Sequence, residues 1–195
     1  MAKAAKFDRQ DVIDKATNLY WKKGFHATSM RNLQDEIDMR PGSIYAAFGS
    51  KDGLFKETLR NYTQMGLDEL QRLVNENESA IDTLKVFIRS QVVETQTGAP
   101  NGMCMLSKTL SELTEDNQDL IDITNEHLNE IGEKLCSIIE WGQTLNEIDK
   151  DKDAKTLAQH LQIQIAGLRT FAKMTADKSL LETKVEEIFN HYPFS

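Results

Sequence analysis

A cluster of small and hydrogen-bonding residues stands near residue 40 of the chain. Arg40 is followed within five positions by Pro41, Gly42, Ser43 and Tyr45. Guanidinium and hydroxyl groups are donors that contact phosphates and base edges, and a glycine lets the backbone come close to a phosphate. These residue types at this spacing suit the recognition of a nucleic acid.

Three further residues could contact the same nucleic acid. Thr28, at the predicted start of a short helix, would present a hydroxyl and free N–H groups where the helix dipole favours an anion. Lys51 begins a later helix and could act in the same way from the other side. Arg31 is either a phosphate contact or a solvated charge, and both readings stay open.

The elements that position these residues are predicted to be helices. Apolar residues recur at 3.6-residue spacing after Asp8, an N-cap, and Gly24 is a natural helix end. A second short helix, capped by Thr28, reaches Ile37, and Pro41 occupies the first turn of a third. Two short helices joined by a tight turn and preceded by a scaffold helix form a helix-turn-helix. Such a unit places its second helix in the major groove of DNA.

The rest of the chain is predicted to be helical as well, which makes the fold all-α with about nine helices. Ser50 caps a long fourth helix and Ser79 opens a fifth, whereas residues 95–102 and 146–152 read as loops. Two last helices are expected over 153–176 and 179–192. We expect a helix-turn-helix domain at 1–50 and a larger helical domain at 51–195, with the helix from Lys51 as the only link between them.

The charge is distributed unevenly along the chain. The net charge is −8, but residues 1–62 carry +3 and the remainder carries −11. Such an asymmetry is a weak sign that one part of the chain meets a polyanion. The acidic part should be repelled by DNA, leaving the N-terminal part to contact it.

Length and composition fit a soluble globular protein. The chain has 195 residues, 39% of them hydrophobic, and its longest apolar run covers only residues 44–48. A bilayer needs ~20 apolar residues, and the start lacks the apolar stretch of a signal peptide. We therefore expect a cytoplasmic protein with no membrane partner. Two cysteines are too few for a disulfide scaffold and suit a reducing compartment.

Two stretches resemble the N-terminal signature of the tetracycline-repressor (TetR) family. They are GFHATSMRNL, from Gly24 to Leu33, and PGSIYAAFGSKDGLF, from Pro41 to Phe55. Pro41 and Ala46 depart from the lysine and the histidine or aromatic residue that many relatives have there. Those departures would change which operator is read and leave DNA binding itself in place.

The resemblance implies a ligand-responsive transcriptional regulator, most often a repressor. Such a protein binds double-stranded operator DNA as a homodimer and responds to a small-molecule effector, here unidentified, in its C-terminal part. In that family the last two helices build the dimer interface. The apolar residues at helical spacing there are Leu161, Ile165, Leu168, Ala172, Val185, Ile188 and Phe189. The alternative is that this stripe faces the core of the same protomer.

Cys104 is a candidate sensor of oxidants or electrophiles. It stands at a predicted helix start with Lys108 four residues later, and both features favour a thiolate. The segment resembles a TetR subgroup in which a Gly-Cys pair leads this helix, although Met103 intrudes between Gly102 and Cys104. The alternatives are an inert buried cysteine and a non-covalent effector.

No catalytic or metal constellation is evident. Asp149, Asp151 and Asp153 imitate the start of an EF-hand loop, but Ala154 and His160 occupy the positions that need Gly and Glu. We therefore expect no cofactor, no metal and no enzymatic activity. Two rival classes remain, a helical ligand-binding protein without DNA function and an enzyme with its site in the C-terminal part.

Overall fold

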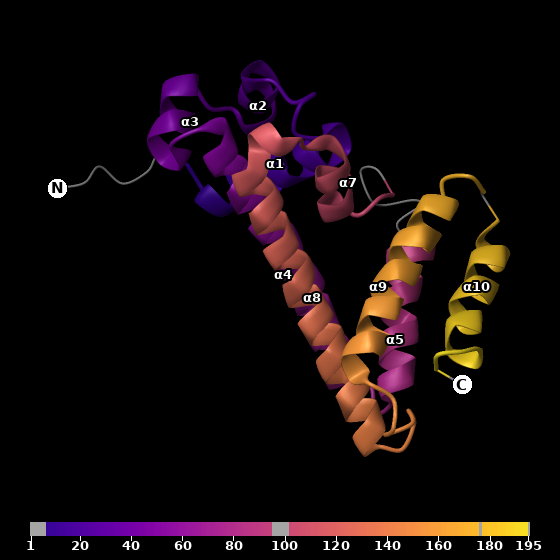
Figure 1. Ribbon diagram of the computed structural model, residues 1–195. Coiled ribbons are helices and arrows are strands. Elements are labelled where there is room, and N and C mark those ends of the chain that lie inside the picture. The colour runs from indigo at the N-terminus through magenta and orange to yellow at the C-terminus, as the bar shows by residue number, and fades with distance from the viewer. Residues whose placement is uncertain (1–6, 95–101, 176, 195) are drawn as a thin grey trace. The chain divides into compact units, whose positions relative to one another are not determined.

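The computed structural model describes residues 7–94, 102–175 and 177–194, and within these ranges the chain forms helices and no strand (Figure 1). The all-α prediction is confirmed. The helices are α1 (Arg9–Lys23), α2 (Met30–Ile37), α3 (Pro41–Phe48), α4 (Lys51–Glu76), α5 (Ala80–Arg89), α7 (Met105–Glu112), α8 (Gln118–Thr144), α9 (Ala154–Phe171) and α10 (Lys178–Asn190), with a π-helix η1 (Ser90–Glu94) and a 3-10 helix η2 (Glu115–Asn117). Among these helices, none is both long and apolar enough to cross a membrane. Most of the predicted loop at 95–102 lies outside the described residues.

Most helix starts follow from local capping. The carboxylate of Asp8 accepts the N–H groups of Gln10 and Asp11, Ser79 caps α5, and Asp153 caps α9. Pro41 is the first residue of α3. The predictions of an N-cap at Asp8, of a helix opened by Ser79 and of Pro41 in the first turn of α3 are confirmed.

The cap of α2 is Ser29 and not Thr28, so that prediction is wrong. Ser29 Oγ accepts the N–H of Asn32, and the Asn32 side chain accepts the N–H of Ser29 in return, which forms a capping box. The Thr28 hydroxyl is bound elsewhere, because it donates to Gly24 O at 2.6 Å.

The chain packs into two compact units. Unit 1 contains residues 1–64 and 105–127, and unit 2 contains residues 65–104 and 128–195. The chain therefore passes between them three times, within α4, just before α7 and within α8. The expectation that the helix from Lys51 is the only link is wrong.

Unit 1 is built around the contact of α1 with α2, α3 and the start of α4. Leu33, Ile44 and Leu54 are fully buried, and the Tyr20 ring meets the Phe55 ring edge-on at 4.7 Å. Gly53 allows α4 to start close to α3, because a Cβ there would lie 2.1 Å from Phe48 O.

Unit 2 has its own hydrophobic core. This core combines residues from α5, η1, α9 and α10 with the second halves of α4 and α8. Leu84, Ile88, Leu161, Leu181 and Val185 are fully buried in it. Each unit thus has the apolar interior that positions its own surface residues.

Candidate nucleic-acid interface

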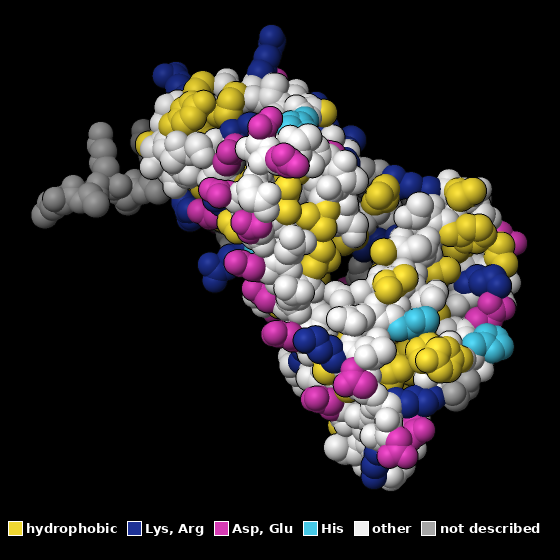
Figure 2. Space-filling model, viewed as in Figure 1, with side chains coloured by type: hydrophobic (Ala, Val, Ile, Leu, Met, Phe, Trp, Pro, Cys, Tyr) yellow, Lys and Arg dark blue, Asp and Glu magenta, His cyan; other side chains and the backbone are white. Residues whose placement is uncertain are grey.

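Helix α3 buries one side and exposes the other. Ile44 and Phe48 face the interior of unit 1. The exposed residues are Arg40, Pro41, Gly42, Ser43, Tyr45 and Ala46, and the Tyr45 side chain keeps 49% of its surface accessible. Figure 2 shows hydrophobic side chains at the surface over α3. The residues predicted to read base edges therefore lie together on one open face.

The turn before α3 leaves Arg40 available for binding. Asp38 ends α2 in the left-handed region, at φ 50° and ψ 46°, which reverses the chain within a few residues. Met39 anchors the turn because its side chain is buried. Arg40 is the N-cap of α3 and makes no side-chain cap hydrogen bond. Arg40 is exposed at the start of the helix.

Arg9 holds the other end of α3, a role that sequence reasoning missed. Its Nη1 donates to Ala47 O at 3.2 Å, and its guanidinium lies 4.5 Å from the centre of the Phe48 ring. It also forms an ion pair with Glu57 of α4. A cation at the carbonyl end of a helix is favourable because of the helix dipole. The only sequence signal was a basic residue just inside the first helix.

Two of the predicted contact residues turn toward the interior of unit 1. Thr28 is buried, and its N–H and hydroxyl donate to Phe25 O and Gly24 O. Lys51 Nζ donates to Phe25 O at 2.7 Å and lies 4.2 Å from the centre of the Phe25 ring. Desolvation by burial lowers the pKa of Lys51.

Arg31 stays on the exposed side of α2.

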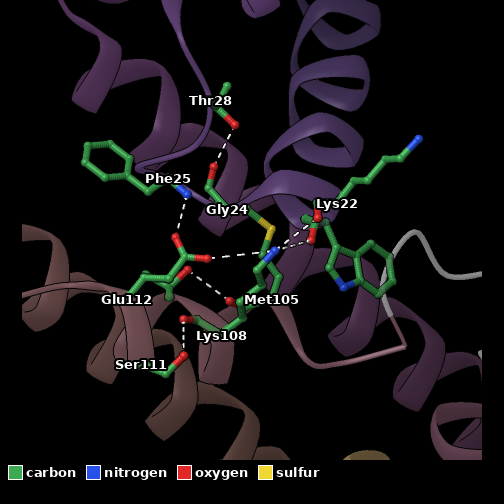
Figure 3. A network of polar contacts seen from close by, with 10 residues as sticks. Lys22, Gly24, Phe25, Thr28, Met105, Lys108, Ser111 and Glu112 are labelled. Atoms are coloured by element: carbon green, nitrogen blue, oxygen red, sulfur yellow. Dashed lines mark hydrogen bonds and ion pairs between the residues drawn. The ribbon is translucent and has the colours of Figure 1, made fainter. Parts of the chain in front are cut away.

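The two residues predicted to form the sensor, Cys104 and Lys108, lie at the start of α7 and on α7. Cys104 is half-buried just before α7. Lys108 Nζ donates to Trp21 O at 3.2 Å and to Lys22 O at 3.1 Å, both at the end of α1 (Figure 3). The contacts described for Lys108 are therefore with α1 and with Glu112, to which it forms an ion pair of 3.8 Å.

The residues predicted for the dimer interface lie largely inside unit 2. Leu161, Val185, Ile188 and Phe189 are buried in its core, and Ile165, Leu168 and Ala172 are packed against that core. Other apolar residues of the same helices and of their connection are exposed, namely Ile163, Phe171, Met174 and Leu180.

Within the described ranges, no three His, Cys, Asp or Glu side chains lie together as metal ligands would.

Two family models match the chain. The model described as "Bacterial regulatory proteins, tetR family" covers residues 12–58, which include α2 and α3. The model described as "Tetracyclin repressor-like, C-terminal domain" covers residues 80–188.

Individual proteins of known sequence or structure are also similar to the chain. The chain is 26% identical over 169 residues to the HTH-type transcriptional repressor ComR of Escherichia coli (strain K12), which is 86% of this chain and 80% of ComR. A TetR family regulator CifR cysteine mutant, solved with operator DNA, has a TM-score of 0.86 at 24% identity over 98% of this chain and 100% of that one. FadR of Bacillus subtilis, solved with stearoyl-CoA, has a TM-score of 0.76 at 17% identity over 93% and 97%.

Proposed function

Because the chain belongs to the TetR family of bacterial regulatory proteins, we propose that it is a ligand-responsive repressor that binds a palindromic operator as a homodimer. The exposed face of α3 carries this proposal. It combines an exposed arginine, small residues that allow close approach and an exposed tyrosine, on a helix fixed by the buried residues Ile44 and Phe48. A dimer would present two such helices about 34 Å apart, one turn of DNA.

The proposed contacts follow from exposure. Arg40 and Ser43 contact base edges, whereas Tyr45 and Arg31 contact phosphates. At the start of α2, the proposed contact is Ser29 and not Thr28, because Ser29 is the exposed capping residue. Lys51 supports the domain from within through Phe25 and is left out of the contact set.

The homodimer is proposed to form through the exposed side of α9 and its connection to α10. Ile163 is 68% exposed and Met174 is 79% exposed. Figure 2 shows hydrophobic side chains gathered over α9 and α10. A second copy of the chain would cover these apolar side chains, which isolated monomers rarely leave exposed as a group.

The effector is proposed to be a small molecule that binds unit 2 without a covalent bond. The complex of Bacillus subtilis FadR with stearoyl-CoA is a precedent from a protein of similar fold. Operator release then reflects the different affinities of two conformations for DNA. A covalent sensor at Cys104 is not proposed, because the ammonium group predicted to favour its thiolate binds carbonyl oxygens of α1. Family and relatives are regulators, so the proposal assigns no catalysis.

The test is to select an operator from randomised DNA and to measure its affinity for the wild type and for Arg40→Ala by fluorescence anisotropy. We expect a loss of about 5- to 150-fold, since a base contact contributes ~1–3 kcal/mol. Arg72→Ala is the matched control, because Arg72 is an exposed arginine of α4 bonded to Glu76. Failure of the wild type to select any sequence, or equal affinities for all three proteins, would contradict the proposal.

A further inference from the structure

Helix α3 is too short to fix its own position. It has eight residues, from Pro41 to Phe48, and isolated helices shorter than ~12–15 residues are marginal in water. At its start, Arg40 makes no side-chain cap hydrogen bond. Ile44 and Phe48 anchor one side of the helix in the interior of unit 1. The direction in which α3 points therefore depends also on what binds its last turn.

The side chain of Arg9 joins the last turn of α3 to two other helices. Arg9 belongs to α1, and its Nη1 donates to Ala47 O at 3.2 Å. That carbonyl group is one of those that a helix leaves without a partner at its end. The guanidinium also lies 4.5 Å from the centre of the Phe48 ring, and its Nη2 forms an ion pair with Glu57 of α4. One planar group thus binds α3 on one side and a carboxylate of α4 on the other.

The two helices that hold this guanidinium are themselves fixed in unit 1. Arg9 lies three residues before Val12 of α1, which is 2% exposed. Glu57 lies on α4 two residues after Phe55, which is 1% exposed. The position of the guanidinium is therefore set by the buried residues of α1 and α4, and the end of α3 follows it.

The place of Arg9 in the sequence is unfavourable for its own helix. Arg9 is the first residue of α1, and the helix dipole disfavours a cation at that end. The ion pair adds little stability in return, because the side chains of Arg9 and Glu57 stay 48% and 36% exposed. Residues that break a local rule often serve a functional site. The contact with α3 is the role that the structure gives to Arg9.

A movement at the end of α3 reaches the residues at its start. Arg40 and Ala47 are seven positions apart, which is about 10 Å along a helix that rises ~1.5 Å per residue. A tilt of α3 about the buried Ile44 would displace Arg40 and Ser43 relative to the DNA. Hydrogen bonds need donor–acceptor distances of about 2.7–3.2 Å, so a displacement of about 1 Å breaks a base contact.

We propose that Arg9 and Glu57 are positioning residues for operator binding. The guanidinium of Arg9 fixes the last turn of α3, and the carboxylate of Glu57 fixes the guanidinium. This inference rests on the proposed function as a repressor that binds operator DNA. Neither residue is assigned a contact with DNA. Loss of either one leaves the unit folded but misplaces α3 at the base edges.

The first experiment compares Arg9→Gln, Arg9→Lys and Glu57→Gln with the wild type on an operator selected from randomised DNA. Each variant should bind the operator about 5- to 150-fold more weakly, the usual effect of losing one base contact. Arg9→Lys keeps the charge but has no planar fork that binds Ala47 O and Glu57 together. The double variant Arg9→Gln/Glu57→Gln should bind no more weakly than Arg9→Gln, because Glu57 acts through Arg9.

Glu57→Gln separates positioning from a simple effect of charge. Removing a carboxylate from the unit that contacts DNA reduces repulsion from the phosphates, so charge alone would strengthen binding to every DNA. Positioning predicts the opposite for the operator, while binding to unrelated DNA stays the same or becomes tighter. Operator binding by Glu57→Gln that equals or exceeds that of the wild type would overturn the role of Glu57.

The salt dependence of operator binding tests whether Arg9 contacts a phosphate directly. The slope of affinity against salt should be the same for Arg9→Gln and the wild type, because a positioning residue releases no counterion. A slope smaller by about one unit would make Arg9 a phosphate contact and overturn the inference.

Lys15 and Asp11 supply the matched controls, since they form another partly exposed ion pair of α1. Lys15→Gln and Asp11→Asn make the same changes of charge and should bind the operator as the wild type does. Circular dichroism checks that each variant is folded at the temperature of the assay; if Arg9→Gln is not, Arg9→Lys and Glu57→Gln decide. Wild-type operator affinity in Arg9→Gln or Arg9→Lys would overturn the inference, whereas a wild type that selects no operator would overturn the proposed function.

Discussion

At the scale of the residue, Gly24 is constrained twice. Its φ of +90° lies in a region that residues with a Cβ rarely adopt, and the missing side chain makes room for the Glu112 carboxylate. Its own N–H closes α1 by donating to Tyr20 O at 2.7 Å. One glycine therefore both ends the helix and admits the contact from α7.

Gly24→Ala should lower the free energy of unfolding by at least about 1–3 kcal/mol, the usual strain of such a backbone conformation. The displaced Glu112 adds to this loss. Urea denaturation followed by circular dichroism measures it. Gly42→Ala is the matched control, because nothing lies within 4 Å of a Cβ there and helix α3 should tolerate it. Equal stability of the Gly24→Ala variant and the wild type would contradict this account of Gly24.

At the scale of the element, the helix starts could be predicted, but the contacts between helices far apart in the sequence could not. Asp8, Ser79 and Asp153 act on N–H groups two or three residues away, so the sequence contains both partners of each cap. The choice between Thr28 and Ser29 failed because both can cap, and the fold directs the Thr28 hydroxyl to Gly24 O.

Contacts between distant elements explain the remaining differences. The bond from Lys108 to Trp21 O joins residues 87 positions apart, and that from Lys51 to Phe25 O joins residues 26 apart. A lysine is a residue type expected beside an anion, which is why the sequence suggested that role for both. Only the packing of α7 and α4 against the end of α1 reveals that each binds a backbone carbonyl instead. The exposed face of α3 was predictable because its periodicity and its motif agree.

A glycine of helix α9 offers a test of the proposed dimer interface. Gly167 is exposed and nothing lies within 4 Å of a Cβ placed there. Gly167→Glu should leave the protomer folded, since a glycine inside a helix costs ~1 kcal/mol relative to alanine. It should separate the proposed dimer, because a carboxylate would be buried in an apolar interface without a partner.

Sedimentation velocity of Gly167→Glu measures the change from dimer to monomer. Gly66→Glu is the matched control, because Gly66 of α4 is also a helical glycine with open space around its Cβ. Dimers of unchanged stability in Gly167→Glu would place the interface elsewhere on the molecule.

At the scale of the whole molecule, packing changes the meaning of the charge asymmetry. Residues 1–64 carry +3, but unit 1 also contains residues 105–127, with one lysine and six acidic residues. Unit 1 as a whole therefore has a net charge of −2, and unit 2 has −6. The proposed binding to DNA therefore depends on individual exposed cations such as Arg31 and Arg40, and not on the net charge of a unit.

The same packing predicts that residues 1–64 do not fold by themselves. Residues 105–127 bury Met105, Leu106, Leu113 and Leu120, none of which belongs to the core of unit 2. Without these side chains, the apolar surface of residues 1–64 that they cover would be exposed to water, which is unfavourable. The fragment also loses the contacts of Lys108 and Glu112 with α1 and Phe25.

We expect no cooperative thermal transition of the fragment by circular dichroism and no sequence-specific DNA binding, although its net charge is +3. Joining residues 1–64 to 105–127 through a flexible linker should restore the transition, and both chains lack the dimer-forming unit, so they form a matched pair. A cooperative transition at the same temperature in both would mean that α7 adds nothing to the folding of the helix-turn-helix domain.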